Sequence, residues 1–186
     1  VVIAWLQGRD AVNGTFVLRQ SILLVYTASY LGYHRVLLDG VLSAQQQDLF
    51  YGWMLLLTTA LTFVFEYLLQ HEYIIPRWGH VLFRTGLAMC LLVIFLMLIG
   101  RKDLALPLNT LLAGLGMLFF FVTSLFLKLR PRSASIVSER YLLPRAAISA
   151  YYSLAVSFLA VSIMPSLGLI GGTMMSIYGV LLYGLL

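Results

Sequence analysis

The chain consists largely of long apolar runs that are separated by short polar links. In residues 48–70, for example, nearly every side chain is aliphatic, aromatic or small. A helix needs about 20 mainly apolar residues to cross the roughly 30 Å of hydrocarbon in a bilayer. Such a helix also satisfies its backbone hydrogen bonds internally, as lipid demands. The runs therefore predict an all-α, polytopic transmembrane helical bundle.

The composition agrees with lipid as the solvent, because 61% of the 186 residues are hydrophobic and 10% are charged. Soluble domains have about 25% charged residues, since they must present a wetted surface. We expect a single domain over residues 1–186 with six spans, and five spans as the alternative, because the first run contains several polar residues. The expected spans are about 15–42, 48–70, 80–100, 105–127, 141–164 and 167–186.

Basic residues predict the orientation of the chain, because Lys and Arg accumulate in cytoplasmic loops. The link 128–145 is the most basic one, so we place it in the cytoplasm. Alternation of the spans then puts the turn 71–84 and both termini on the same side. This arrangement leaves nine Lys and Arg residues inside and three outside. We expect an integral protein of a bacterial inner membrane or an organellar membrane.

Glu66 lies inside the second expected span, about one turn from its end, where a charge needs a partner. Arg84 lies at a similar depth in the third span, across the short turn between the two. We expect these side chains to form an ion pair that closes a helical hairpin. The alternative is that Glu66 binds a proton or another cation.

Polar clusters are expected at both ends of the bundle. His34, Arg35 and Asp39 lie at the outer end of the first span, and Arg35 and Asp39 share a helical face and can pair. This cluster is interpreted as a helix end in water, with an external binding or sensing site as the alternative. In the cytoplasmic link, five residues are expected to set topology and to contact anionic lipids. They are Lys128, Arg130, Arg132, Arg140 and Arg145.

Small residues recur every four positions in the last two expected spans. Such faces let helices approach closely, which favours packing within the chain, with other membrane subunits or in a homo-oligomer. The residues are Ser149, Ser153, Ser157, Gly168, Gly172 and Ser176.

No motif of an established catalytic chemistry is present in the sequence, so no catalytic residue is assigned and an enzyme is disfavoured. His71, Glu72 and His80 lie in one turn, but their spacing matches no zinc signature, and we predict no metal site. All three histidines fall near span ends, which disfavours haem, and no other cofactor is indicated. The net charge of +5 is attributed to topology and lipid contact rather than to nucleic acid.

The leading interpretation is a non-catalytic multi-pass membrane module. It would be an accessory or structural subunit of a membrane complex, or the membrane sensor-anchor of a signalling protein. The chain begins at Val1 and ends at Leu186 inside an apolar run, so both ends look trimmed, and the cytoplasmic part of such a signalling protein would lie outside this sequence. One alternative is a small transporter or channel, or half of one, that uses Glu66 and Arg84. The other is a membrane-lipid enzyme that holds a phosphate with loop 128–145.

Overall fold

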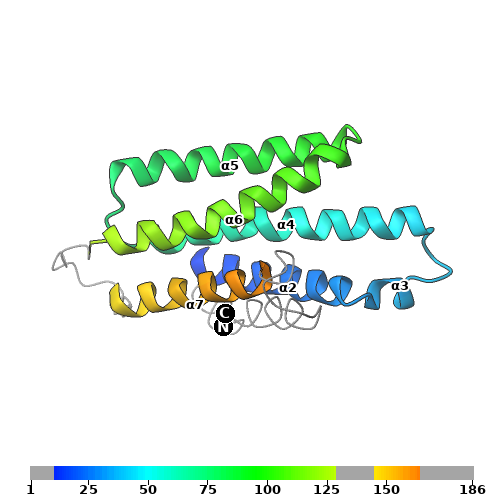
Figure 1. Ribbon diagram of the computed structural model, residues 1–186, viewed down its shortest axis with the longest axis horizontal. Coiled ribbons are helices and arrows are strands. Elements are labelled where there is room, and N and C mark those ends of the chain that lie inside the picture. The colour runs from blue at the N-terminus through cyan, green and yellow to red at the C-terminus, as the bar shows by residue number, and fades with distance from the viewer. Residues whose placement is uncertain (1–10, 129–144, 164–186) are drawn as a thin grey trace.

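The computed structural model describes residues 11–128 and 145–163, and these form a bundle of α-helices (Figure 1). Within the described residues, β structure is limited to a single antiparallel bridge between Ile74 and Lys128. The prediction of an all-α fold is therefore confirmed for this part of the chain. The helices are α2 (Ala11–Tyr30), α3 (Tyr33–Leu37), α4 (Ala44–His71), α5 (Arg77–Leu98), α6 (Lys102–Phe126) and α7 (Arg145–Ile163).

Three of these helices, α4, α5 and α6, are long and apolar enough to cross a membrane. They correspond to the second, third and fourth expected spans. Helix α7 coincides with the fifth, although its described apolar stretch, Ala146–Ser157, is shorter than a full span. The sixth expected span lies outside the described residues. Three such helices are consistent with an integral membrane protein.

The first expected span, 15–42, is not one continuous helix. Helix α2 ends at Tyr30, and α3 follows as a separate helix of five residues. Gly32 and Gly40 adopt φ values of 85° and 75°, a conformation that residues with a Cβ rarely adopt and that interrupts the helix twice. Helix α2 is not among the three helices apolar enough to cross a membrane. The expectation for this segment was therefore wrong in its extent.

Helix α4 lies at the centre of the bundle. Helices α5 and α6 pack on one side of it, and α2 and α7 lie on the other side, with α7 also against α6 (Figure 1). One apolar cluster gathers around Phe63, Phe83, Phe120 and Tyr152 from α4 to α7. A second, smaller cluster centres on Leu56, near the other end of α4, α5 and α6. Helix α4 therefore packs against α2, α5 and α6, and it reaches α7 through the side chains of Glu66 and Gln70.

Candidate functional site

A row of polar side chains runs along α4 and is buried inside the bundle. Thr58, Thr62, Glu66 and Gln70 recur every four residues, so they share one face of the helix. The two threonine hydroxyls donate to carbonyls one turn earlier on α4, as serine and threonine commonly do in apolar helices. Glu66 and Gln70, by contrast, interact with side chains of other helices.

Tyr152 of α7 binds both of these side chains with one hydroxyl. The hydroxyl donates to Oε2 of Glu66 and accepts from Nε2 of Gln70 at 3.0 Å. Nε2 of Gln70 also donates to the carbonyl of Phe120 on α6, at 3.3 Å. Because that carbonyl can only accept, the amide nitrogen of Gln70 must face it. One glutamine thus joins α4 to both α6 and α7.

Arg19 of α2 brings a positive charge into the same region. Its side chain is 0% exposed, and its Nε donates to the hydroxyl of Thr62 at 3.3 Å. The guanidinium lies 5.2 Å from the ring centre of Phe65, a distance at which a cation is attracted by the ring face. It also attracts the carboxylate of Glu66 electrostatically. We call Arg19, Thr62, Glu66, Gln70 and Tyr152 the buried polar network.

The expected ion pair between Glu66 and Arg84 does not form. Arg84 is exposed on α5, whereas Glu66 is 1% exposed and faces α2 and α7. The reason is that α5 packs on a different side of α4, so closeness across the turn does not bring the two side chains together. Glu66 instead accepts a hydrogen bond from Tyr152 of α7, and the cation that attracts it electrostatically is Arg19, from the segment that the sequence predicted to be the weakest span.

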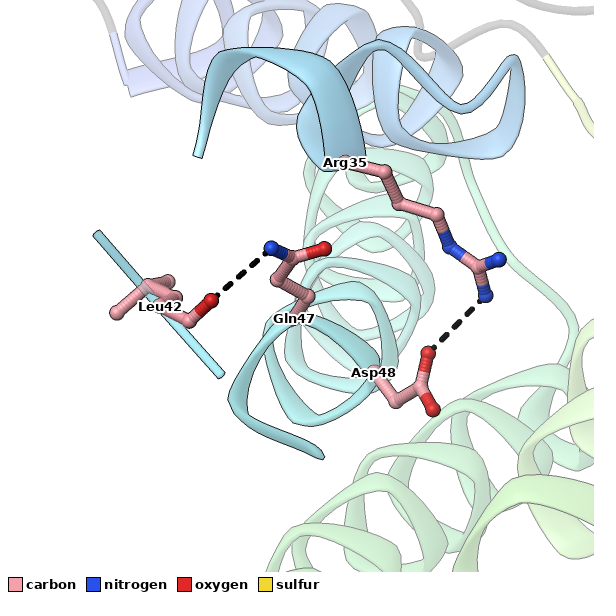
Figure 2. A network of polar contacts seen from close by, with 4 residues as sticks. All are labelled: Arg35, Leu42, Gln47 and Asp48. Atoms are coloured by element: carbon pink, nitrogen blue, oxygen red, sulfur yellow. Dashed lines mark hydrogen bonds and ion pairs between the residues drawn. The ribbon is translucent and has the colours of Figure 1, made fainter. Parts of the chain in front are cut away.

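The polar cluster at the start of α4 is also arranged differently from the expectation (Figure 2). Arg35 pairs with Asp48 of α4, with Nη2 and Oδ1 3.2 Å apart, and not with Asp39. Helix α3 ends at Leu37, before Asp39, so Arg35 and Asp39 do not share a helical face. The predicted pairing of Arg35 with Asp39 required a continuous helix through this segment.

The link between α3 and α4 is fixed by Gln47, which is buried (Figure 2). Its Nε2 donates to the carbonyls of Leu42 and Leu38, at 3.1 and 3.4 Å. His34 is also buried here and stacks on the rings of Phe50 and Tyr51. These contacts make the α3–α4 junction an ordered cap over one end of the bundle.

The small-residue face of α7 makes few contacts where it is described. Ser153 and Ser157 are exposed, and their hydroxyls donate to the carbonyls of Ser149 and Ser153. Among the α7 side chains that the structure describes, those of Ile148, Tyr152 and Ala155 are buried. The expected partners on the last span, namely Gly168, Gly172 and Ser176, lie outside the described residues.

Two of the basic residues expected to contact lipid headgroups lie in the described part. Lys128 is exposed, and its backbone pairs with Ile74 at the α4–α5 turn. Arg145 is the first residue of α7. Arg130, Arg132 and Arg140 lie outside the described residues.

The turn between α4 and α5 brings His71 and His80 together, with their ring centres 6.3 Å apart beside Tyr67. Partial burial raises the pKa of the neighbouring Glu72 carboxyl. In the described ranges, no group of three or more His, Cys, Asp or Glu side chains is placed to hold a metal ion. The sequence had already singled out this turn, and the structure adds the aromatic contacts.

Comparisons with protein-family models, curated proteins and solved structures give no match for this chain. Its function must therefore be argued from the geometry of the buried polar network. That geometry allows two kinds of chemistry: hydrogen bonds that hold helices together, and exchange of a proton at Glu66.

Proposed function

We propose that the chain is a non-catalytic multi-pass membrane module. It serves as an accessory or structural subunit of a membrane complex, or as the membrane sensor-anchor of a signalling protein. The observation that carries this proposal is the contact of Tyr152 with Glu66 and Gln70, which joins α7 to α4. The buried polar groups are engaged mainly with one another across helices, and this favours a role in helix packing.

Such a network makes the positions of the helices depend on one another. Interhelical hydrogen bonds in lipid are worth about 1–2 kcal/mol in model peptides and about 0.6 kcal/mol on average within a folded membrane protein. Displacing α7 would deprive Glu66 of the donor at its Oε2 and Gln70 of an acceptor. A movement imposed on one helix is therefore transmitted to the others, which suits a module that relays or stabilises a conformation.

The finer features of the proposal follow the charge pattern of the sequence. We propose six spans, with α2 alone as the first, and both termini in the cytoplasm of a bacterium or in the equivalent compartment of an organelle. The basic link 128–145 would then lie against anionic lipid headgroups. Other membrane subunits or further copies of the chain would pack on the small-residue face of α7.

The proposal is tested by reconstituting the full chain in liposomes and measuring ion flux and lipid turnover. We expect neither activity. The second measurement is the mass of the protein extracted from its native membrane in a lipid nanodisc. We expect a discrete complex larger than the 20.8 kDa chain, and we expect Tyr152→Phe to weaken it. Flux that disappears in Glu66→Gln, or turnover of a lipid, would overturn the proposal.

A small transporter or channel is the second candidate, and one observation favours it. Glu66 is a buried carboxylate in a helix that is apolar enough to cross a membrane, and such residues often mark ion or proton pathways. In that case Arg19, and not Arg84, would be its counter-charge. The flux measurement above distinguishes the two candidates.

A further inference from the structure

We propose that Glu66 and Gln70 form a proton-binding site inside the bundle. Glu66 takes up a proton on Oε1 and donates it to Oε1 of Gln70. The inference rests on the buried polar network that also supports the proposed function, and it names the ligand to which that network responds.

Two buried oxygens have no hydrogen-bond donor among the described residues. They are Oε1 of Glu66 and Oε1 of Gln70, on side chains that are 1% and 0% exposed. The Gln70 amide cannot turn to relieve this, because its nitrogen is held by the Phe120 carbonyl and the Tyr152 hydroxyl. Burying a hydrogen-bond acceptor without a donor costs free energy. A donor to these two oxygens would therefore stabilise the structure.

The carboxyl group of Glu66 and the amide group of Gln70 lie side by side. Glu66 and Gln70 are four residues apart on α4, and both bind the same hydroxyl of Tyr152. A protonated carboxyl group has one O–H donor and keeps acceptor capacity on its other oxygen. A single proton therefore supplies a donor for Oε1 of Gln70 and leaves the bond from Tyr152 to Oε2 of Glu66 in place. The proton comes from water, no covalent bond to carbon changes, and the carboxylate loses its charge.

Several neighbouring groups favour the ionised form of Glu66. Arg19 from α2 attracts the carboxylate, and the Tyr152 hydroxyl from α7 donates to its Oε2. The neighbouring Tyr151 also favours the charged form, although Oε1 has no hydrogen-bond partner in the described part of the chain. Glu66 thus has two alternative partners: Arg19 when it is ionised, and Gln70 when it is protonated. In the protonated state Arg19 keeps its contacts with Thr62 and the Phe65 ring. Proton uptake therefore weakens the attraction between α2 and α4 and preserves the contact between α4 and α7.

The test is an infrared difference titration of the full chain in lipid nanodiscs. We expect a carbonyl band of a protonated carboxylic acid to appear reversibly on acidification and to be absent in Glu66→Gln. In Gln70→Leu the band should shift in frequency, because the acceptor of the proton is removed. Glu72→Gln is the matched control, since this carboxyl lies just beyond α4, and it should leave the band unchanged. A Glu66 that remains ionised while the protein stays folded, or a band that ignores Gln70→Leu, would overturn the proposal.

A second measurement distinguishes a change in helix packing from the misfolding of a variant. In Glu66→Gln the amide can still accept from Tyr152 and donate to Gln70, so this variant imitates the protonated state. Spin labels on the exposed positions Leu24→Cys of α2 and Leu49→Cys of α4, with Cys90→Ala, report the distance between these helices. We expect the distance to change on acidification in the wild type and to stay at the acid value in Glu66→Gln. No change with pH would overturn the packing step, whereas ion flux would overturn the proposed function and leave proton binding intact.

Discussion

The hydroxyl of Tyr152 acts as a donor and an acceptor at once, and this is why a tyrosine and not a phenylalanine suits the position. Its ring is 0% exposed and belongs to the apolar cluster around Phe63. The hydroxyl donates to Glu66 and accepts from Gln70. One side chain therefore contributes both to apolar packing and to the buried polar network.

Tyr152→Phe is expected to destabilise the protein, because it keeps the ring but removes the hydroxyl. Glu66 Oε2 then loses a donor and Gln70 Nε2 loses an acceptor. The expected loss is about 1–3 kcal/mol in the free energy of unfolding, which denaturant titration in detergent micelles would measure. The control is Ser153→Ala, because that exposed hydroxyl bonds to a carbonyl of its own helix. Equal losses in both variants would contradict a network role for Tyr152.

Replacing Arg19 tests whether it is the charge partner of Glu66. Arg19→Met leaves a buried carboxylate without its cation and is expected to cost about 3–5 kcal/mol of unfolding free energy. Adding Glu66→Gln removes that charge and should recover part of the loss, as a double-mutant cycle would show. The control is Arg84→Met, at an exposed position, with an expected effect within about 0.5 kcal/mol. A larger loss at Arg84 than at Arg19 would contradict this assignment.

At the residue scale, the sequence identified Glu66 but not its partners. A carboxylate in a long apolar run is visible to hydropathy, because the cost of burying it does not depend on the fold. Arg19 and Tyr152 meet Glu66 only through tertiary packing across 47 and 86 positions of sequence. The four-residue spacing of Thr62, Glu66 and Gln70 was the available signal, since it places all three on one face of a helix.

At the scale of elements, the close approach of α4, α5 and α6 depends on two glycines. The ring of Phe63 on α4 lies against Gly86 of α5 and Gly116 of α6. A Cβ at Gly86 would overlap the ring, and one at Gly116 would come within 2.6 Å of it. Because both glycines abut the same ring, movement of the ring away from one added methyl is restricted by the other helix.

Gly86→Ala and Gly116→Ala are each expected to lower the free energy of unfolding by about 1–3 kcal/mol through overpacking against Phe63. Gly114→Ala is the matched control on α6, because nothing lies within 4 Å of its added Cβ. Combining Gly86→Ala with Phe63→Leu should cost less than the sum of the two single changes, since the smaller side chain leaves room. A destabilised Gly114→Ala would indicate a general intolerance of alanine instead.

The α3–α4 junction is expected to depend on Gln47. Gln47→Ala removes the donor to the carbonyls of Leu38 and Leu42 and should cost about 1–3 kcal/mol of local stability. Hydrogen exchange of the amides in residues 38–42 would measure the loss as faster exchange. Gln45→Ala is the control, because Gln45 is exposed on the first turn of the same helix. Unchanged exchange in Gln47→Ala would contradict this role.

The elements that the sequence predicted best are those for which hydropathy alone is decisive. The ends of α4, α5 and α6 fall within four residues of the expected spans. The first span failed because apolar residues recur from Leu31 to Leu38 on either side of His34 and Arg35, while the backbone turns at Gly32. Hydropathy carries no information about the backbone angle φ. The sequence shows that a glycine occupies position 32, but not that it adopts a positive φ.

At the scale of the whole molecule, two sets of contacts define its two ends. The bridge between Ile74 and Lys128 joins the α4–α5 turn to the end of α6. At the other end, Gly52 of α4 lies close to Met97 of α5 and Leu106 of α6. The α5–α6 turn and the start of α4 therefore lie at the same end of the bundle. Helices α4, α5 and α6 alternate in direction, as the predicted topology requires (Figure 1).

Single-cysteine labelling of intact cells tests this arrangement together with the proposed orientation. In a Cys90→Ala background, Arg77→Cys and Lys128→Cys mark one end, and Asp39→Cys and Lys102→Cys mark the other; all four positions are exposed. Because Lys and Arg are concentrated at the first end, we expect that end to be cytoplasmic. A membrane-impermeant maleimide should then label positions 39 and 102 directly, and positions 77 and 128 only after permeabilisation. Labelling of 77 and 128 alone would reverse the orientation but keep the bundle, whereas different access within either pair would contradict the arrangement of the helices themselves.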